Sequence, residues 1–332
     1  TAYSVKQGQQ PTADSEKQGR QPTADSEKES QQTSAVDVHA GPAVRKQARE
    51  YGVDLSRVRG TGRSGRILKE DVQAYVKQSL DRGDGRGASI PPVSLPDFSK
   101  IGETEIVPLS RVRRTSARNL HRSWLNVPHV TQFDEADITE LEAFRKSQNE
   151  ELAAAGKKVT PLAFLVKACV YTLMQYPRFN ASLDKDIENL VLKKYFNIGI
   201  AVDTEDGLVV PVIKDAEKKG VIELAQESAR LAEQARNKKL GLDAMQGATF
   251  TISSLGGIGG TAFTPIINSP EVAILGVSRS RIAPVYDGKE FRPRTLLPLS
   301  LSYDHRAIDG AEAARFIVYL AQVLSDIRRI VM

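Results

Sequence analysis

The stretch Asp304-His305-Arg306-Ala307-Ile308-Asp309-Gly310 joins two segments that differ in hydrophobic periodicity. Residues 296–303 before it form a largely apolar run, which is typical of a buried strand. Residues 311–330 after it are amphipathic, and Asp309 with Glu312 has the form of a capping box at a helix start. The sequence therefore predicts a strand, a tight turn and a helix, with a histidine between two carboxylates in the turn.

His305 is the best placed of the four histidines, the others being His39, His121 and His129. Histidine suits proton transfer near neutral pH because its ordinary pKa is about 6.5. The pKa of a thiol is about 8.5, so the proton transfer is uphill by only about two pKa units, roughly 3 kcal/mol. We therefore predict that His305 is a general base. The alternative is a plain strand-to-helix turn, in which Asp309 only caps the helix.

A second stretch, TISSLGGIGG at residues 251–260, ends an apolar run with two hydroxyls and a glycine-rich turn. Glycines let the backbone approach a ligand closely, and the hydroxyl of Ser253 could stabilise an oxyanion. The alternative is a polar strand end followed by a loop. A dinucleotide site is disfavoured, because Pro265 and Pro270 follow where such a site needs a helix.

Residues 100–332 are expected to form one large domain in which helices and strands alternate. Asp137 and Glu140 suggest a capping box, and Thr160-Pro161 opens an apolar helix that Pro177 ends. A charged helix is expected over residues 222–239, and an Asp-Gly turn at residues 206–207. Strands are expected over residues 187–202, 207–213, 249–253, 272–277 and 297–302. This alternation predicts a mixed α/β fold with a substantial sheet.

Residues 38–78 are expected to form a small separate domain. One helix should cover residues 42–51, beginning at Pro42 and stopped by Gly52, and a second should cover residues 69–76. The glycine-rich loop at 60–65 separates them. Its predicted core is Val44, Ala48, Val53, Leu55, Val58, Ile67, Leu68 and Val72.

The net charge of +5 is concentrated in residues 39–78, where nine Lys and Arg face four Asp and Glu. A basic domain on a neutral body favours an acidic macromolecular partner. Nucleic acid is disfavoured, because this segment has only Tyr51 and Tyr75 as aromatics and no nucleic-acid motif. A single cysteine, Cys169, fits a reducing compartment, so we expect a cytoplasmic protein. No Cys and His cluster has metal-ligand spacing, and no metal is expected.

Two linkers are expected. Residues 1–37 are polar and contain a tandem repeat of period eleven without large apolar residues, which predicts a flexible linker. Residues 79–99 are rich in glycine and then in proline. Because the chain starts at Thr1 within a linker, it is expected to be a fragment of a longer protein.

These motifs together resemble the acyltransferase family of 2-oxo acid dehydrogenase complexes, and most closely its branch in bacterial pyruvate dehydrogenase complexes. The resemblance rests on DHRAIDG at 304–310, on TISSLG at 251–256 and on GIAVDTEDGLVVP at 199–211. It implies a catalytic domain of chloramphenicol-acetyltransferase fold, preceded by a peripheral subunit-binding domain at residues 38–78. In that family His305 would activate a thiol, Asp309 would be its motif partner, and Ser253 would stabilise the tetrahedral oxyanion.

The resemblance also implies substrates and partners. The acetyl group would pass from a dihydrolipoyl arm, on a domain missing from this chain, to coenzyme A. Arg145, Thr160, Asp203 and Ser254 match coenzyme A contacts, although Thr160 could be only a helix cap and Arg145 only a surface residue. Arg45, Lys46, Arg49 and Arg66 match the residues that dock the pyruvate decarboxylase component and dihydrolipoamide dehydrogenase.

The family assembles as trimers with active sites between subunits, and a pyruvate-type bacterial sequence favours a 24-mer cube over a 60-mer. The segment at residues 119–133 resembles the acetyl-transferring branch. A second hypothesis is a non-catalytic scaffold that only docks partner enzymes, which would be expected to lack His305. A third, acetyl transfer to an antibiotic hydroxyl, gives no reason for a docking domain.

Overall fold

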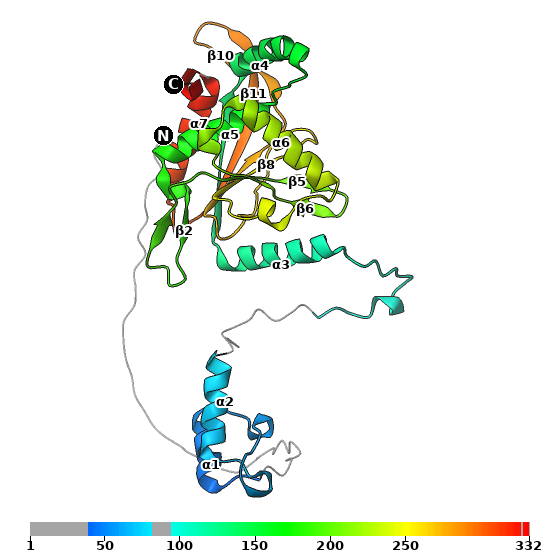
Figure 1. The fold of residues 1–332 in the computed structure, drawn as a ribbon, viewed down its shortest axis with the longest axis vertical. Coiled ribbons are helices and arrows are strands. Elements are labelled where there is room, and N and C mark those ends of the chain that lie inside the picture. Colours follow the sequence, from blue (N-terminus) through cyan, green and yellow to red (C-terminus); the bar gives the residue numbers. More distant parts are fainter. Residues whose placement is uncertain (1–38, 82–93, 327, 332) are drawn as a thin grey trace, which may run out of the picture. The chain divides into compact units, whose positions relative to one another are not determined.

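The computed structural model describes residues 39–81, 94–326 and 328–331 of the chain (Figure 1). The chain divides into two compact units, residues 1–104 and 105–332. The predicted linker at 1–37 and residues 82–93 of the second predicted linker lie outside the described residues. None of the helices in the described ranges is long and apolar enough to cross a membrane.

The first unit is built on two helices, α1 (Pro42–Glu50) and α2 (Lys69–Asp81), with short 3-10 turns η1 (Leu55–Arg57), η2 (Arg63–Gly65) and η3 (Phe98–Lys100). As predicted, Pro42 is in the first turn of α1, and Gly52 follows its end with φ +63°. The second helix is longer than predicted and continues past residue 76 to Asp81, because neither glycine nor proline interrupts that segment.

The core of this unit is close to the predicted one. Ala48, Val58, Ile67 and Val72 are buried, and the predicted residues Val44, Val53 and Leu55 are partly buried. The inclusion of Leu68 was wrong, since it is 38% exposed. Leu68 lies directly before α2, where its backbone N–H donates to the carboxylate of Asp71 (2.9 Å) and its side chain remains near the surface.

Asp71 ties the glycine-rich loop to the start of α2. Its carboxylate accepts hydrogen bonds from the backbone N–H (3.0 Å) and hydroxyl (2.7 Å) of Thr61, in addition to that from Leu68. These bonds hold the pKa of Asp71 below its ordinary value, the Leu68 N–H contributing most. The loop requires glycine at position 60, because a Cβ there would collide with the carbonyl oxygen of Gly65.

The second unit contains a seven-stranded mixed sheet, which confirms the predicted α/β class. In spatial order its strands are β1 (His129–Asp137), β11 (Phe291–Asp304), β9 (Ala273–Val277), β8 (Phe250–Ser254), β4 (Ile198–Ile200) and β7 (Val212–Ile213). A further strand, β10 (Arg281–Tyr286), pairs with β11. The β8 strand is parallel to β4 and β9, whereas the other pairs are antiparallel.

The helices of this unit are α3 (Arg111–Asn126), α4 (Thr139–Leu152), α5 (Pro161–Gln175), α6 (Val221–Arg236), α7 (Gly310–Ser325) and α8 (Arg328–Val331). Short 3-10 turns are η4 (Ala153–Ala155), η5 (Pro177–Phe179), η6 (Ala216–Lys218) and η7 (Leu242–Met245). The apolar helix α5 packs against α6 and α7. The rings of Phe179 and Phe316 stack at 4.1 Å, and Phe250 of the sheet lies 6.1 Å from Phe316. These contacts join α7 to the sheet and fix the turn that precedes it.

Residues 187–213 form five short strands instead of the predicted two. The hairpin of β2 (Ala181–Leu183) and β3 (Leu190–Leu192) ends before β4, because the Asn180 amide donates to the carbonyls of Lys193 and Tyr195 (both 3.0 Å). A second hairpin, β5 (Val202–Thr204) and β6 (Gly207–Val209), contains the predicted Asp-Gly turn. Pro211 then separates β6 from β7, since it has no N–H to donate.

Two helix predictions were wrong in detail. The Asp137 carboxylate accepts from the backbone N–H of Thr139 (3.0 Å) rather than capping α4, whose N-cap is Ile138. Glu140 instead faces Arg294 at 3.9 Å, so no capping box forms. The predicted helix at 311–330 breaks at Asp326, whose backbone is extended and whose carboxylate pairs with the Arg328 guanidinium at 2.7 Å.

Candidate active site

The turn at residues 305–309 presents His305 between β11 and α7. The side chain of His305 is exposed, and its backbone N–H donates to the carbonyl oxygen of Pro128 (3.1 Å). Its ring centroid lies 5.8 Å from that of Tyr303. No hydrogen bond joins the imidazole to another side chain among the described residues, so both ring nitrogens are available to a ligand.

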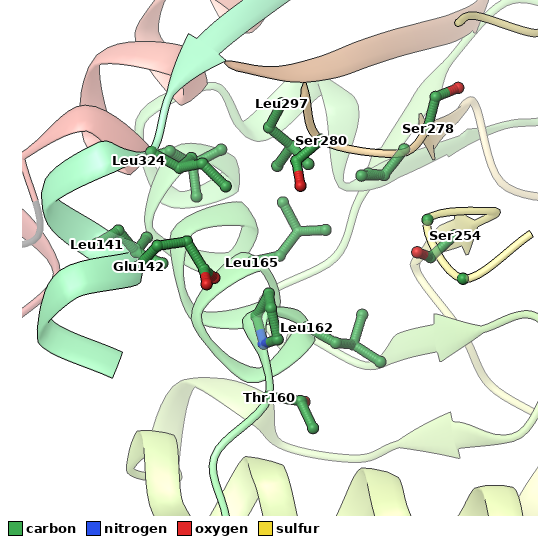
Figure 2. Close-up of a pocket in the computed structure, with 15 residues that line it drawn as sticks. Leu141, Glu142, Thr160, Leu162, Leu165, Ser254, Ser278, Ser280, Leu297 and Leu324 are labelled. Atoms are coloured by element: carbon green, nitrogen blue, oxygen red, sulfur yellow. The ribbon is translucent and has the colours of Figure 1, made fainter. Parts of the chain in front are cut away.

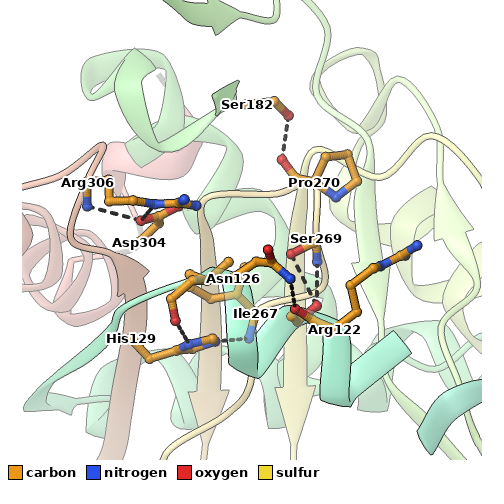
Figure 3. A network of polar contacts seen from close by, with 11 residues as sticks. Arg122, Asn126, His129, Ser182, Ile267, Ser269, Pro270, Asp304 and Arg306 are labelled. Carbon is orange, nitrogen blue, oxygen red and sulfur yellow. Dashed lines mark hydrogen bonds and ion pairs between the residues drawn. The ribbon is translucent and has the colours of Figure 1, made fainter. Parts of the chain in front are cut away.

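Neither neighbouring carboxylate is directed to the imidazole. Asp304 is 3% exposed and forms an ion pair with Arg306 at 2.7 Å (Figure 3). Asp309 caps α7, its carboxylate accepting from the backbone N–H of Glu312 (2.8 Å), as expected of a helix cap. The Glu312 side chain faces Arg178 at 3.7 Å, so only half of the expected capping box forms. Both carboxylates therefore fix the turn itself.

His129 begins β1 beside the end of β11, although the sequence did not single it out. Its Nε2 accepts from the backbone N–H of Ile267 (3.0 Å), and its Nδ1 lies 2.7 Å from the carbonyl oxygen of Val127 (Figure 3). With Nε2 accepting, Nδ1 is the ring nitrogen that can donate to Val127. In the sheet register His129 lies opposite Asp304. The sequence signal was weak, because a histidine at a strand start has many uses.

Ser253 and Ser254 end β8, as the sequence predicted, and the glycine-rich turn follows. Ser253 is partly exposed and lies opposite Gly276 of β9, which in turn lies opposite Ser300 of β11. Ser300 and His305 are five residues apart on β11 and the turn after it, which corresponds to roughly 15 Å along a strand. A single chain therefore places Ser253 and His305 toward opposite ends of the sheet.

A pocket of about 290 Å³ opens beside Ser254 (Figure 2). Its lining comes from α4, α5, α7 and β11, from the last residues of β8 and β9, and from the segments that follow these two strands. Most of the lining is apolar, including Leu141, Leu162 and Leu165. Thr160 and Ser254, both predicted coenzyme A contacts, lie on this lining together. Thr160 occupies the N-cap position of α5, but its hydroxyl makes no capping hydrogen bond.

Arg145 lies next to this pocket, and its side chain is only 16% exposed, so it is not a plain surface residue. Its guanidinium pairs with Glu142, which lines the pocket, at 2.8 Å, and this hydrogen bond raises the pKa of Arg145. Asp203, the fourth predicted contact, is exposed on β5 and is absent from the lining. The structure thus gathers three of the four residues.

The predicted docking residues lie on the first unit. Arg45, Lys46 and Arg49 are exposed on α1, and Arg66 is exposed after η2. Arg45 and Arg49 are one helical turn apart, so they share a face of α1. The Arg45 Nε donates to the carbonyl oxygen of Ala40 (3.2 Å), which limits the side chain's freedom. In the described ranges, no group of His, Cys, Asp and Glu is arranged to hold a metal ion.

Comparison with known proteins gives two family matches. Residues 101–332 match the family model of 2-oxoacid dehydrogenases acyltransferase (catalytic domain), and residues 38–73 match that of the e3 binding domain. A relative from Pseudomonas aeruginosa, the dihydrolipoyllysine-residue acetyltransferase component of pyruvate dehydrogenase complex, is 59% identical over 301 residues. The aligned region covers 89% of this chain and 55% of the relative.

The same component from Azotobacter vinelandii is 60% identical over 302 residues, which is 89% of this chain and 47% of the relative. The chain thus spans about half the length of these relatives. A solved structure of Azotobacter vinelandii dihydrolipoamide acetyltransferase, from a study of a serine, a histidine and an asparagine in its catalytic mechanism, is similar with a TM-score of 0.72. A solved structure of the cubic core of a pyruvate dehydrogenase multienzyme complex is also similar, with a TM-score of 0.72. Both are 61% identical and cover 73% of this chain and 100% of the solved chain.

Proposed function

The chain belongs to the 2-oxoacid dehydrogenase acyltransferase family, and from this premise we propose that it transfers an acetyl group from S-acetyldihydrolipoamide to coenzyme A. It would do so in the core of a bacterial pyruvate dehydrogenase complex, as its relatives' names indicate for them. The lipoyl group would be carried on a domain other than the two that the family models match. A catalytic domain at 100–332 would follow a docking domain at 38–78 and a linker at 79–99.

In the proposed reaction, His305 accepts the proton of the coenzyme A thiol. The sulfur then attacks the carbonyl carbon of the acetyl thioester, and the hydroxyl of Ser253 donates a hydrogen bond to the resulting oxyanion. When the intermediate collapses, the bond to the dihydrolipoyl sulfur breaks and that sulfur takes the proton from the imidazolium. No covalent acyl-serine is required.

The observation that carries this proposal is the spacing of three residues. In the Azotobacter vinelandii study the serine precedes the histidine, and the asparagine follows it, by the same intervals that separate Ser253, His305 and Asp309. Aspartate replaces asparagine at the third position. Both side chains can accept a hydrogen bond from a backbone N–H at a helix start, which is the bond that Asp309 makes.

The sheet register supports an active site between two copies of the chain. Because Ser253 and His305 lie toward opposite ends of one sheet, a single reaction centre would take His305 from one copy and Ser253 from another. The pocket beside Ser254 would then hold coenzyme A in the second copy. Trimers that assemble into a 24-mer fit this requirement, and the similar solved structure is a cubic core. We place this assembly in the cytoplasm.

Replacing His305 with alanine tests the proposal. We expect acetyl transfer from acetyl-dihydrolipoamide to coenzyme A to fall by about 10²–10⁴-fold, because the general base is lost. Particle mass by light scattering should stay unchanged. His121→Ala, at an exposed position on α3, is the matched control and should keep the parent rate. Near-normal turnover by His305→Ala would exclude the proposed mechanism, and a parent protein without transfer activity would favour the scaffold hypothesis.

A further inference from the structure

Beside the pocket, the guanidinium of Arg145 donates its hydrogen bonds to the carboxylate of Glu142. Arg145 Nη2 lies 2.8 Å from Glu142 Oε2, and Arg145 Nε donates to Oε1 at 3.0 Å, so the pairing is bidentate. The two side chains are only 16% and 19% exposed. A third donor, Nη1, lies 3.4 Å from the carbonyl oxygen of Val159. A bidentate pair with little solvent access is stronger than an exposed one.

The two partners differ in their relation to the pocket. Glu142 is on the lining and Arg145 is not. Figure 2 shows the Glu142 side chain extending from α4 toward Thr160 and Leu162. Among the described residues that line the pocket, Glu142 is the only charged one. A phosphate-bearing ligand that enters would therefore first meet a carboxylate, which repels it, and not the guanidinium that suits a phosphate.

We propose that Glu142 is an exchangeable counter-ion for Arg145 that moderates the binding of phosphate-bearing acceptors. The Glu142 carboxylate satisfies the guanidinium, which would be costly to leave without a partner at this burial. When the acceptor binds, a phosphate group takes over the bidentate donors and the Glu142 side chain turns away. This inference rests on the proposed function, since coenzyme A is the acceptor named there.

The exchange has two consequences for binding. Part of the binding free energy of the phosphate group is spent on breaking the ion pair. Glu142 therefore weakens the binding of coenzyme A and favours product release. This cost falls only on acceptors that carry phosphate, because an acceptor without phosphate leaves the ion pair intact. Glu142 is thus a positioning residue for Arg145 that does not itself touch the reacting atoms.

The Glu142→Gln variant tests this with a binding measurement. Glutamine keeps the size of the side chain and one acceptor oxygen but removes the charge. By titration calorimetry of the assembled protein without acetyl donor, we expect the Kd of coenzyme A to fall about five- to tenfold, the difference between a charge-assisted and a neutral hydrogen bond. With pantetheine, which has no phosphate, that gain should be absent. Glu151→Gln, at an exposed position of α4, is the matched control and should change neither affinity.

A double-mutant cycle separates the possible outcomes. In an Arg145→Ala background, the gain in coenzyme A affinity from Glu142→Gln should be smaller than in the parent, because the guanidinium that pairs with the phosphate is gone. An equal gain in both backgrounds would point to direct repulsion alone and overturn the exchange. Equal gains with coenzyme A and pantetheine would overturn the inference, and so would weaker coenzyme A binding by Glu142→Gln. If the parent binds coenzyme A and transfers acetyl groups while Glu142→Gln has no effect, only this inference fails. If the parent does neither, the proposed function fails with it.

Discussion

Replacing Glu271 with glutamine should remove a pH dependence from the folding stability of the second unit. The carboxylate is 3% exposed. Its Oε1 accepts from Thr251 Oγ1 (2.9 Å) and Asn268 Nδ2 (2.8 Å), whereas its Oε2 has no hydrogen-bond partner among the described residues. Burial raises the pKa of Glu271 from 4.5 to about 7, although these bonds and the charge of Lys193 act to lower it.

The sign and magnitude follow from the two pKa values. The unfolded carboxyl ionises near pH 4.5 and the folded one near pH 7, so between these values the folded state binds more protons. The free energy of unfolding therefore falls as pH rises through this window and levels off above it. One pKa unit corresponds to about 1.4 kcal/mol, which gives a loss of about 3 kcal/mol. For a unit of this size that is roughly 6–12 °C in Tm.

The assay compares Tm of Glu271→Gln and the parent at fixed protein concentration from pH 4.5 to 8.5. The two should be similar near pH 4.5, and the variant should gain about 3 kcal/mol relative to the parent by pH 8.5. Glu188→Gln, at an exposed position near the β2–β3 hairpin, controls for charge alone and should follow the parent. A stability difference between Glu271→Gln and the parent that does not change with pH would refute the reasoning. That result would show Glu271 already ionised and balanced by Lys193.

Asp309→Asn should keep the α7 cap and most of the acetyl transfer activity, whereas Asp309→Ala should cost about 1 kcal/mol of stability in thermal unfolding. Equal losses of activity in both variants, without loss of stability, would show that the carboxylate acts in catalysis. Arg45→Ala should weaken binding of dihydrolipoamide dehydrogenase and of the pyruvate decarboxylase component in titrations, and parent binding should fall with added salt. Arg57→Ala in the same unit is the control, and an affinity indifferent to both salt and Arg45 would indicate an apolar contact.

The local sequence pattern was enough to predict an element when consecutive residues alone favour that element. The strand, turn and helix around His305 could be predicted because the apolar run and the helix-capping residue lie close together in the sequence. The α5 helix could be predicted for the same reason, since Pro161 and Pro177 bound it. Helix α3 was not predicted, because its sequence is rich in arginine and Ser123 is its only buried residue. Its apolar residues Leu120 and Trp124 lie one turn apart but are exposed in this chain.

The sequence by itself therefore determined the family, the fold class, the positions of His305 and Ser253 at strand ends, and the small basic domain. Only the tertiary structure decided how the elements of the second unit relate to one another. Strand order and register place Ser253 and His305 toward opposite ends of the sheet, and they exclude Asp203 from the pocket that holds Thr160 and Ser254. Burial of Glu271 likewise arises from contacts with residues distant in the chain. Such pairings depend on which segments meet in space, and no local pattern of residues encodes that.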